Sequence, residues 1–359
     1  MLADLEELVG CESFSADHAA LARSAATVGA LGTRLTGAEP DLIVLDGVSH
    51  LRWTFGTPRV LLLGHHDTVW PTGSLRTHPW SVTAGTARGP GVLDMKAGLV
   101  MLFHALASLP SLDGVCVLIN GDEETGSTTS RQLIEETARN CAATLVLEPA
   151  ADDRGTLKTA RKGASRYDVE IHGRAAHAGL EPHRGINASV EAAHQILALA
   201  EIGADPALGA TTVTPTLLSA GSARNTVPAR ARVSVDVRVP STAAQDRIDT
   251  VIRNLTPRTP GARLEIVAGA RRPPMEPGSS TELFALAAEI AADLGQGPLH
   301  GVAVGGVSDG NHTAAAGCPT LDGLGAVGAG AHADNEHIYI DRLIPRTRLL
   351  TELITRTAS

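Results

Sequence analysis

Two histidines and an aspartate follow directly on an apolar run in the segment LLLGHHDTVWPTG, residues 61–73. Imidazole and carboxylate groups are costly to bury unless they are paired or bind a metal ion. Two further apolar runs end in the same way. The acids that follow them are Asp122, Glu123 and Glu124 after residues 115–119, and Glu148 after residues 145–147. Groups that can do chemistry therefore gather at the ends of several predicted strands.

Two more candidate groups stand in other segments. Asp94 lies in GPGVLDMKAG, where we expect a helix to begin, and His332 lies in GAGAHADNEH, beyond the apolar run at 319–325. The carboxyl ends of the strands in an open parallel sheet line one edge, and ligands bind at that edge. We therefore expect groups from four strands and one loop to meet in one crevice.

The residue types in this crevice predict a metal site. Converging carboxylates repel one another, and a bound dication removes that repulsion. Histidine and carboxylate ligands suit zinc, with cobalt or manganese as alternatives. Five ligands and a spare acid are more than one catalytic zinc uses. They fit two zinc ions about 3.5–4 Å apart that share a carboxylate.

Each of these motifs has an ordinary explanation when it is taken alone. His65 could be a core histidine, the paired glutamates a solvated turn, Asp94 a helix N-cap and Glu148 a loop acid. The metal site is favoured because these separate explanations would all have to hold at five positions together.

The elements around these groups predict an α/β fold. Short apolar runs, typical of strands buried on both faces, occur at residues 59–64, 114–121, 143–149 and 319–325. Helical stretches lie between them, at residues 94–110 and 127–140. Strands that alternate with helices favour a mostly parallel sheet with helices on both faces.

The middle third of the chain has a different pattern. Residues 229–240 alternate apolar and polar side chains, which is typical of a sheet with one face in water. The order strand, helix, strand, strand, helix, strand predicts an inserted α+β domain of the ferredoxin-like kind. We expect residues 161–270 to form this domain, and residues 1–160 and 271–359 to form the metal-binding domain.

Composition and charge argue against several functional classes. The 359 residues carry a formal net charge of −9 without a long basic run, so no nucleic-acid or anionic-membrane partner is expected. No apolar stretch reaches the roughly 18 residues that a membrane span requires. The N-terminal residues 1–15 predict an amphipathic helix rather than a signal peptide. The four cysteines are far apart in sequence, which favours reduced thiols in a cytoplasmic protein.

Together, the motifs resemble those of a known family. GHHDTV, GPGVLDMKAG, GDEETGS, LEP, GRAAHAG and GAHADNEHI are similar to motifs of the co-catalytic zinc metallopeptidases and amidohydrolases. That family includes glutamate carboxypeptidase, aminoacylase and succinyl-diaminopimelate desuccinylase. The resemblance covers nearly the whole chain and is strongest to the carboxypeptidase G type. It implies that residues 161–270 act as a lid or dimerisation domain and that the protein is a homodimer.

The resemblance also implies roles for individual residues. One metal ion would be bound by His65 and Glu148, the other by Glu124 and His332, and Asp94 would bridge the two. Asp67 would support the ligand geometry, and Glu123 would act as the general base. The residues that contact the substrate would be His177, Asn225, Arg238 and Gly306.

The activity that this resemblance implies is hydrolysis of an amide bond in an N-acyl amino acid or short peptide. The metals would activate a water molecule, Glu123 would accept its proton, and His177 would help to stabilise the oxyanion. Arg238 and Asn225 would hold the carboxylate of the released amino acid, for which a C-terminal glutamate is one candidate.

Two alternatives stay open at this point. The first is a deacylase of a small biosynthetic N-acyl amino-acid intermediate, which would differ only in the shape of its pocket. The second is a non-catalytic protein that binds amino-acid derivatives, which would be expected to lack the base or a metal ligand.

The chain departs from the family pattern in two places. His66 stands beside His65, and the HxD spacing favours His65 as the ligand. The segment LKTARKG is more basic than the family requires. Lys158, Arg161 or Lys162 could recognise a second substrate carboxylate, or the segment could be a solvated hinge.

Overall fold

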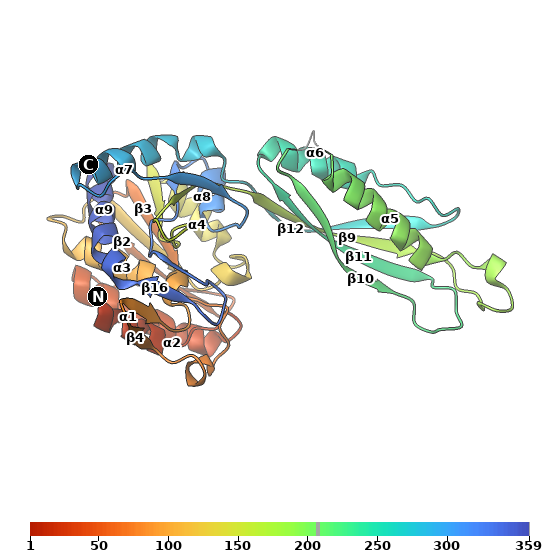
Figure 1. The fold of residues 1–359 in the computed structure, drawn as a ribbon, viewed down its shortest axis with the longest axis horizontal. Coiled ribbons are helices and arrows are strands. Elements are labelled where there is room, and N and C mark those ends of the chain that lie inside the picture. Colours follow the sequence, from red (N-terminus) through yellow and green to blue (C-terminus); the bar gives the residue numbers. More distant parts are fainter. Residues whose placement is uncertain (206–208, 359) are drawn as a thin grey trace. The chain divides into compact units, whose positions relative to one another are not determined.

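The computed structural model describes residues 1–205 and 209–358, and the chain divides into two compact units (Figure 1). Unit 1 contains Met1–Arg161 and the chain from Met275 onward, and unit 2 contains Lys162–Pro274. These transitions lie one and four residues beyond the boundaries expected from the sequence. Across both described stretches, none of the helices combines the length and the apolar character needed to cross a lipid bilayer.

Unit 1 is built on a six-stranded sheet. Its strands, in spatial order, are β1 (Asp41–Leu45), β2 (Val48–Thr54), β6 (Val115–Asn120), β3 (Val60–His65), β7 (Ala143–Val146) and β14 (Thr320–Leu321). The last four strands run parallel, whereas β2 pairs antiparallel with both β6 and β1. Every residue of β3, β6 and β7 is buried, as expected for strands covered on both faces.

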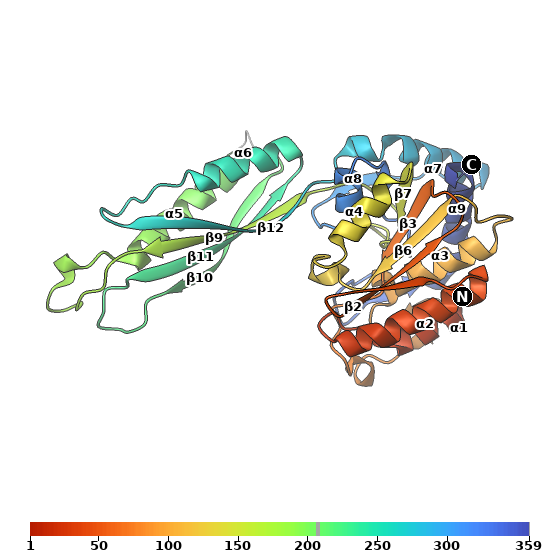
Figure 2. The ribbon, with the colours of Figure 1, turned by 180° about the vertical axis from the view of Figure 1, so that it is seen from behind.

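Helices cover both faces of this sheet (Figure 2). The helices of unit 1 are α1 (Leu2–Gly10), α2 (His18–Thr36), α3 (Ala97–Ala107), α4 (Arg131–Arg139), α7 (Thr281–Asp293), α8 (Gly310–Ala315) and α9 (Ile340–Ala358). Leu62 on one face belongs to the core formed with α1, α2, α3, α7 and α9, whereas Leu61 and Leu63 on the other face pack with α4. The predicted α/β architecture is confirmed.

Two helices begin later than predicted. The helix expected from residue 94 begins at Ala97 as α3, and Asp94 lies in a kinked turn, Val92–Lys96, with φ −114° and ψ 93°. The helix expected from residue 127 begins at Arg131 as α4. In the preceding turn, the buried carboxylate of Asp122 accepts hydrogen bonds from backbone N–H groups. Tertiary hydrogen bonds override the local helix preference in such places.

Short strands complete unit 1. β8 (Leu157–Arg161) and β13 (Gly301–Val304) form a parallel pair. A small antiparallel sheet contains β15 (Gly328–Ala329), β16 (His337–Tyr339), β5 (Thr86–Arg88) and β4 (Ser81–Thr83). Because β15 and β16 lie on either side of His332 in the chain and pair with each other, they close a loop that carries this residue.

Unit 2 is an α+β sandwich. Its elements, in chain order, are β9 (Gly163–His172), α5 (Ala188–Gly203), β10 (Thr212–Ala220), β11 (Arg230–Val239), α6 (Thr242–Arg253) and β12 (Arg263–Arg272). The strands form an antiparallel sheet in the order β10-β11-β9-β12, which is the ferredoxin-like arrangement. Val233, Val235 and Val237 of β11 are buried in a core with α5 and α6, while alternate polar side chains face the other side.

Candidate metal centre

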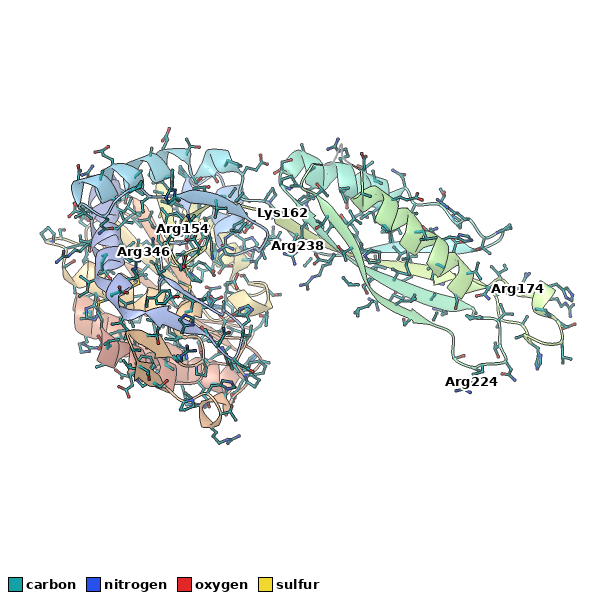
Figure 3. All side chains as sticks on the ribbon, viewed as in Figure 1. Arg154, Lys162, Arg174, Arg224, Arg238 and Arg346 are labelled. Atoms are coloured by element: carbon teal, nitrogen blue, oxygen red, sulfur yellow. The ribbon has the colours of Figure 1, made fainter. Side chains whose placement is uncertain are left out.

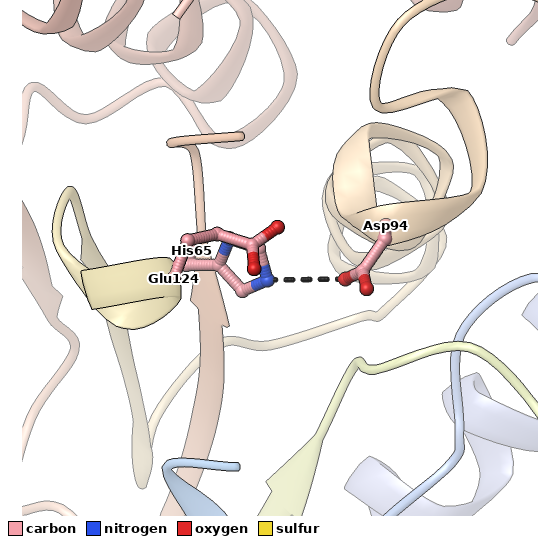
Figure 4. Close-up of side chains that lie close together, drawn as sticks. All are labelled: His65, Asp94 and Glu124. Atoms are coloured by element: carbon pink, nitrogen blue, oxygen red, sulfur yellow. Dashed lines mark hydrogen bonds and ion pairs between the residues drawn. The ribbon is translucent and has the colours of Figure 1, made fainter. Parts of the chain in front are cut away.

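Side chains from the carboxyl edge of the central sheet gather around two histidines. His65 ends β3, Glu148 follows β7, and Glu124 lies in a turn after β6. His65 Nε2 lies 3.2 Å from Asp94 Oδ1 (Figure 4) and 3.5 Å from Glu148 Oε1. His332 Nε2 lies 3.4 Å from Asp94 Oδ2 and 3.2 Å from Glu124 Oε2. The structure thus brings all five expected ligands together.

Asp94 occupies the centre of this cluster. Its Oδ1 faces His65 and its Oδ2 faces His332, so its two oxygens are directed at different histidines. The candidate ligand atoms of His65, Asp94 and Glu124 lie within 4.8 Å of one another. The cluster divides into a half with His65 and a half with His332, and Asp94 belongs to both.

The donor set fits divalent metal ions. Glu124 Oε1 is buried and has no hydrogen-bond partner among residues 1–205 and 209–358. Burial raises the pKa of Glu124, and hydrogen bonding to His332 only partly opposes that rise. A buried, unpaired carboxylate oxygen is costly, and a dication beside it would remove the cost. Histidine nitrogen and carboxylate oxygen are also the donors that zinc takes in catalytic sites.

The carboxylates of the cluster raise the pKa values of both histidines. Hydrogen bonds with Asp94 and Glu124 raise the pKa of His332 to about 10. Burial opposes charge on His65, but its contacts with Asp67 and two further carboxylates raise its pKa well above the usual value. Burial likewise opposes charge on Asp94, but the two histidines hold its pKa well below the usual range. Metal ions and protons therefore compete for the same nitrogen atoms.

Asp67 is fully buried behind His65. His65 Nδ1 lies 3.3 Å from Asp67 Oδ1 and 3.0 Å from the Asp67 backbone oxygen. The carboxylate also accepts hydrogen bonds from the backbone N–H groups of Glu123 and Glu124, both at 3.2 Å, and from the Ser15 hydroxyl at 2.8 Å. Asp67 therefore fixes both the ring of His65, a candidate ligand, and the turn that carries the two glutamates.

His66 points away from the cluster. Its Nε2 lies 2.9 Å from the backbone oxygen of Ser49, and burial lowers its pKa to about 4, which keeps the ring neutral. Successive side chains of an extended chain point to opposite faces, so only one of two neighbouring histidines can join the cluster. That residue is His65.

A pocket of about 610 Å³ lies beside the cluster within unit 1. Asp94 and Glu148 line one part of it, and Lys158 and Arg161 of β8 line another. Lys158 and Arg161 are both buried, so the alternative prediction of a solvated hinge is wrong for these two residues. Lys162 belongs to unit 2, where its amine donates a hydrogen bond to a backbone oxygen.

The two basic residues of the pocket differ in how many polar contacts they already make. The Arg161 guanidinium lies 2.6 Å from an oxygen of Asp322 and 3.4 Å from one of Glu148, and it donates to the backbone oxygen of Gly306 at 3.1 Å. The contacts of Arg161 thus hold Glu148 and the turn that contains Gly306. Lys158 Nζ has a single ionic contact among the described residues, 3.6 Å from Glu148 Oε2. Lys158 is thus the pocket cation with donors to spare.

His177 and Asn225 lie side by side in unit 2. A bridge pairs His177 with Thr226, and a backbone hydrogen bond of 2.8 Å joins the two segments at Asn225. His177 Nδ1 accepts hydrogen bonds of 3.1 Å from the backbone N–H groups of Gly179 and Leu180. A neutral ring therefore carries its proton on Nε2, and this exposed N–H can act as a donor.

Arg238 lies at the opposite end of the sheet of unit 2, as the labelled Arg224 and Arg238 show (Figure 3). Arg238 pairs with Ala164 near the start of β9, whereas His177 and Asn225 lie beyond the far end of β9 and β11. β11 has 10 residues, and a strand of that length spans roughly 30 Å. Within one chain, the structure does not bring Arg238 together with the other two candidates.

Two buried acids of the site were not predicted. Asp322 holds Arg161, and Glu336 accepts hydrogen bonds from the backbone around Asp94. Glu336 is visible in the motif GAHADNEH, but no local pattern indicates the segment that it contacts. Both contacts depend on residues far apart in the chain.

The chain is similar to proteins of a known family. The family model described as "Peptidase family M20/M25/M40" matches residues 61–356. The chain is 31% identical to carboxypeptidase G2 of Pseudomonas sp. (strain RS-16), over 97% of this chain and 88% of that protein. It is 28% identical to a succinyl-diaminopimelate desuccinylase of Gluconacetobacter diazotrophicus, over 83% of this chain and 81% of that protein.

Solved structures share the fold. Aminopeptidase PepT from Bacillus cereus superposes with a TM-score of 0.76 at 20% identity, and covers 100% of this chain and 98% of its own. The M20 family metallo-carboxypeptidase Sso-CP2 from Sulfolobus solfataricus superposes with a TM-score of 0.72 at 17% identity, over 99% and 98% of the two chains. At these identities, the likeness concerns the fold alone.

Zinc binding should release protons from this centre and should strengthen as the pH rises. The raised pKa values keep His65 and His332 protonated near pH 7 in the metal-free protein. Zinc must displace these protons. The apparent zinc affinity should therefore fall progressively as the pH drops below the raised pKa values, and it should reach its full value only above them. Calorimetry at pH 7, in buffers of different ionisation enthalpy, should record about one to two protons released per chain.

Two variants make this measurement specific. His332→Gln should lower the number of released protons by about one, because one competing nitrogen is gone. His300→Gln alters an exposed histidine of unit 1 and should leave the number unchanged. Zinc binding without proton release would contradict the electrostatic description of the centre.

Proposed function

The chain belongs to peptidase family M20/M25/M40, and we propose that it releases an amino acid from an N-acyl amino acid or short peptide. The family match and the similarity to its relatives indicate a metallohydrolase that acts on amide bonds. The finer parts of the proposal are two zinc ions, Glu123 as general base and a cytoplasmic homodimer. A C-terminal glutamate is the first candidate for the released residue.

The position of Asp94 between His65 and His332 carries this proposal. A carboxylate whose two oxygens face different histidines suits two ions that share one ligand. His65 and Glu148 would complete the shell of one ion, and His332 and Glu124 that of the other. The cost of bringing these carboxylates together is otherwise hard to offset.

The chain's own groups supply the rest of the chemistry. Bound zinc would make a water molecule more acidic and would polarise the amide carbonyl. Glu123, whose backbone N–H is held by Asp67, would accept the proton of that water and deliver it to the leaving nitrogen. His177 would donate its Nε2 hydrogen to the oxygen that becomes negative.

An anionic substrate is favoured by the pocket of unit 1. Lys158 offers a buried ammonium group with spare donors, and a charge-assisted hydrogen bond to a carboxylate would use them. Arg238 and Asn225 would hold the carboxylate of the released amino acid. Glutamate is the first candidate because its second carboxylate would meet Lys158. Release of a C-terminal residue is favoured because one relative is named carboxypeptidase G2.

A deacylase of a small N-acyl amino-acid intermediate is the second candidate. The relatives named as succinyl-diaminopimelate desuccinylases favour it, because a succinyl group carries a carboxylate on the acyl side of the amide. Lys158 would then bind the acyl group rather than the side chain of the released residue. The two candidates therefore differ in which half of the substrate bears the second negative charge.

Pairing of two chains through unit 2 is the proposed assembly. The edge strand β10 exposes Leu217 and Leu218, at 71% and 58%, and α5 exposes Leu197 at 60%. An exposed edge strand with apolar side chains is a ready surface for pairing with another chain. Pairing would let His177 and Asn225 serve a partner's site, which accounts for their distance from Arg238.

A hydrolysis screen tests the proposed function directly. N-acyl amino acids and dipeptides should be cleaved, with amino-acid release detected by mass spectrometry. Matched substrates should differ only in the position of a second carboxylate, in the acyl group or in the released residue. Lys158→Met should lower kcat/KM about 10–100-fold for the preferred anionic substrate, because one charge-assisted hydrogen bond is lost. It should change neutral substrates little. An enzyme that cleaves no amide would refute the proposal.

Glu123→Gln should separate chemistry from metal binding. The variant should retain two zinc ions and lose about 10²–10⁴-fold in kcat, because removal of a general base has that effect. Glu124→Gln removes a proposed zinc ligand instead, so its main defect should be weaker zinc binding. Zinc content by elemental analysis and kcat from the same samples give the comparison. A Glu123→Gln enzyme near wild-type kcat would remove Glu123 from the mechanism.

His177 should act on the partner's site. His177→Ala and Glu123→Gln homodimers should each be nearly inactive. A mixed dimer should contain one site with an intact base and an intact histidine, because the two defects would lie at different sites. Activity should then recover toward half of the wild-type value per mixed dimer.

Subunit exchange is the control for this experiment. Native mass spectrometry of the same mixture should show the heterodimer that gives the recovered activity. Exchange without recovery would mean that His177 acts in its own chain or has no catalytic part.

A further inference from the structure

Glu336 is a buried carboxylate that holds the backbone around Asp94. It is only 3% exposed. Its Oε1 accepts hydrogen bonds from the N–H groups of Leu93 at 2.8 Å and Asp94 at 3.1 Å. Its Oε2 accepts from the N–H of Gly91 at 3.1 Å and from the indole N–H of Trp70 at 2.7 Å. Backbone N–H groups of one short turn thus form a cradle for a single anion.

The same residue belongs to the loop that carries His332. His332 has a φ of 64°, in the left-handed region that residues with a β-carbon seldom adopt, so the surrounding loop must hold it there. Two backbone hydrogen bonds of 2.9 Å, Ala333 to Gly330 and Glu336 to Ala333, tighten this loop. Glu336 therefore connects the loop of one ligand to the turn of another.

These contacts distinguish Glu336 from an acid that serves only a turn. Glu12 gives a comparison, since its carboxylate also accepts two backbone hydrogen bonds, from Gly73 at 2.8 Å and Leu75 at 3.0 Å. The turn that Glu12 holds carries no candidate ligand. The turn that Glu336 holds contains Asp94, and its own loop contains His332.

We propose that Glu336 is a positioning residue that sets the separation of Asp94 and His332. It thereby sets the affinity for the metal ion that these two residues share with Glu124. Asp94 would also bind the ion held by His65 and Glu148. That ion should depend on Glu336 less, because within residues 1–205 and 209–358 neither His65 nor Glu148 forms a hydrogen bond or ion pair with Glu336. This inference rests on the proposed two-metal centre.

Glu336→Gln is the most direct test. Glutamine keeps the shape of the side chain, but its NH₂ group would face N–H donors where an oxygen now accepts. In competition with a chelator, one of the two zinc ions should bind about 10–100-fold more weakly, as is typical when a partner behind a ligand is lost. The other zinc should be retained, so the stoichiometry should fall from two toward one. In the metal-free protein, the fluorescence of Trp70 should also change, because its indole loses an acceptor.

Two matched variants separate positioning from general stability. Glu12→Gln makes the same chemical change at a turn without ligands and should leave both zinc affinities unchanged. Trp70→Phe removes one of the four donors and keeps the three backbone N–H groups, so zinc affinity should change by only a few-fold. Glu336→Gln should have the larger effect on zinc affinity by a clear margin.

The outcomes that would overturn the inference are distinct. A folded Glu336→Gln variant that binds both zinc ions with wild-type affinity would do so. If that variant does not fold, Glu336→Asp, which keeps the charge, takes its place with the same expected loss of zinc affinity. If neither folds, Glu336 serves the fold rather than the metal centre. A wild-type chain that binds no zinc would instead refute the proposed function, and this inference with it.

Discussion

The crowding of negative charge at the carboxyl edge of one sheet is the constraint on which the site depends. Parallel strands end on the same side, so acids that follow different strands are brought together whatever their separation in sequence. His65 and His332 lie among these carboxylates and, when protonated, compensate part of the negative charge. The rise of the His332 pKa to about 10 shows how strongly the surrounding carboxylates favour a cation there. A centre with this electrostatic character would favour dications, because each ion could replace a proton and add a further positive charge.

Hydrogen bonds from backbone N–H groups stabilise other buried carboxylates of the site. Asp67 is held by the N–H groups of Glu123 and Glu124, and Glu336 is held by those of Leu93 and Asp94, together with others. Each of these acids is buried, and each fixes a segment that carries candidate ligands. A lysine or arginine in the same places would satisfy the acids equally well. It would also place a fixed positive charge beside the candidate metal centre, whereas peptide dipoles stabilise the acid without adding a charge that would repel a metal ion.

The sequence predicts the parts of the molecule that local pattern determines. β3, β6 and β7 are recognisable because their residues are apolar without alternation. The sheet then determines where the candidate ligands at the ends of these strands lie. The start of α3 is not recognisable, because the turn at Asp94 is specified by Glu336, which lies far along the chain. The burial of Arg161 is hidden for the same reason, since its partner Asp322 is equally remote. Alternation along β11 predicts its two faces, but no pattern within it shows that Arg238 and His177 lie at opposite ends of the sheet.

The two units differ in net charge, and this difference increases the importance of Lys158 for binding a carboxylate in unit 1. Residues 162–274 contain 14 Lys and Arg against 10 Asp and Glu, whereas the rest of the chain contains 16 against 29. The negative charge of unit 1 would attract metal ions and, before they bind, would repel an anionic substrate. Bound metal ions would neutralise part of that negative charge, so the metal-loaded and metal-free centres would present different charges to the same substrate. Lys158 lies within the pocket itself, where the low dielectric strengthens its attraction over that of exposed charges. Recognition of a carboxylate there would therefore depend both on Lys158 and on prior metal binding, which orders the two events on electrostatic grounds alone.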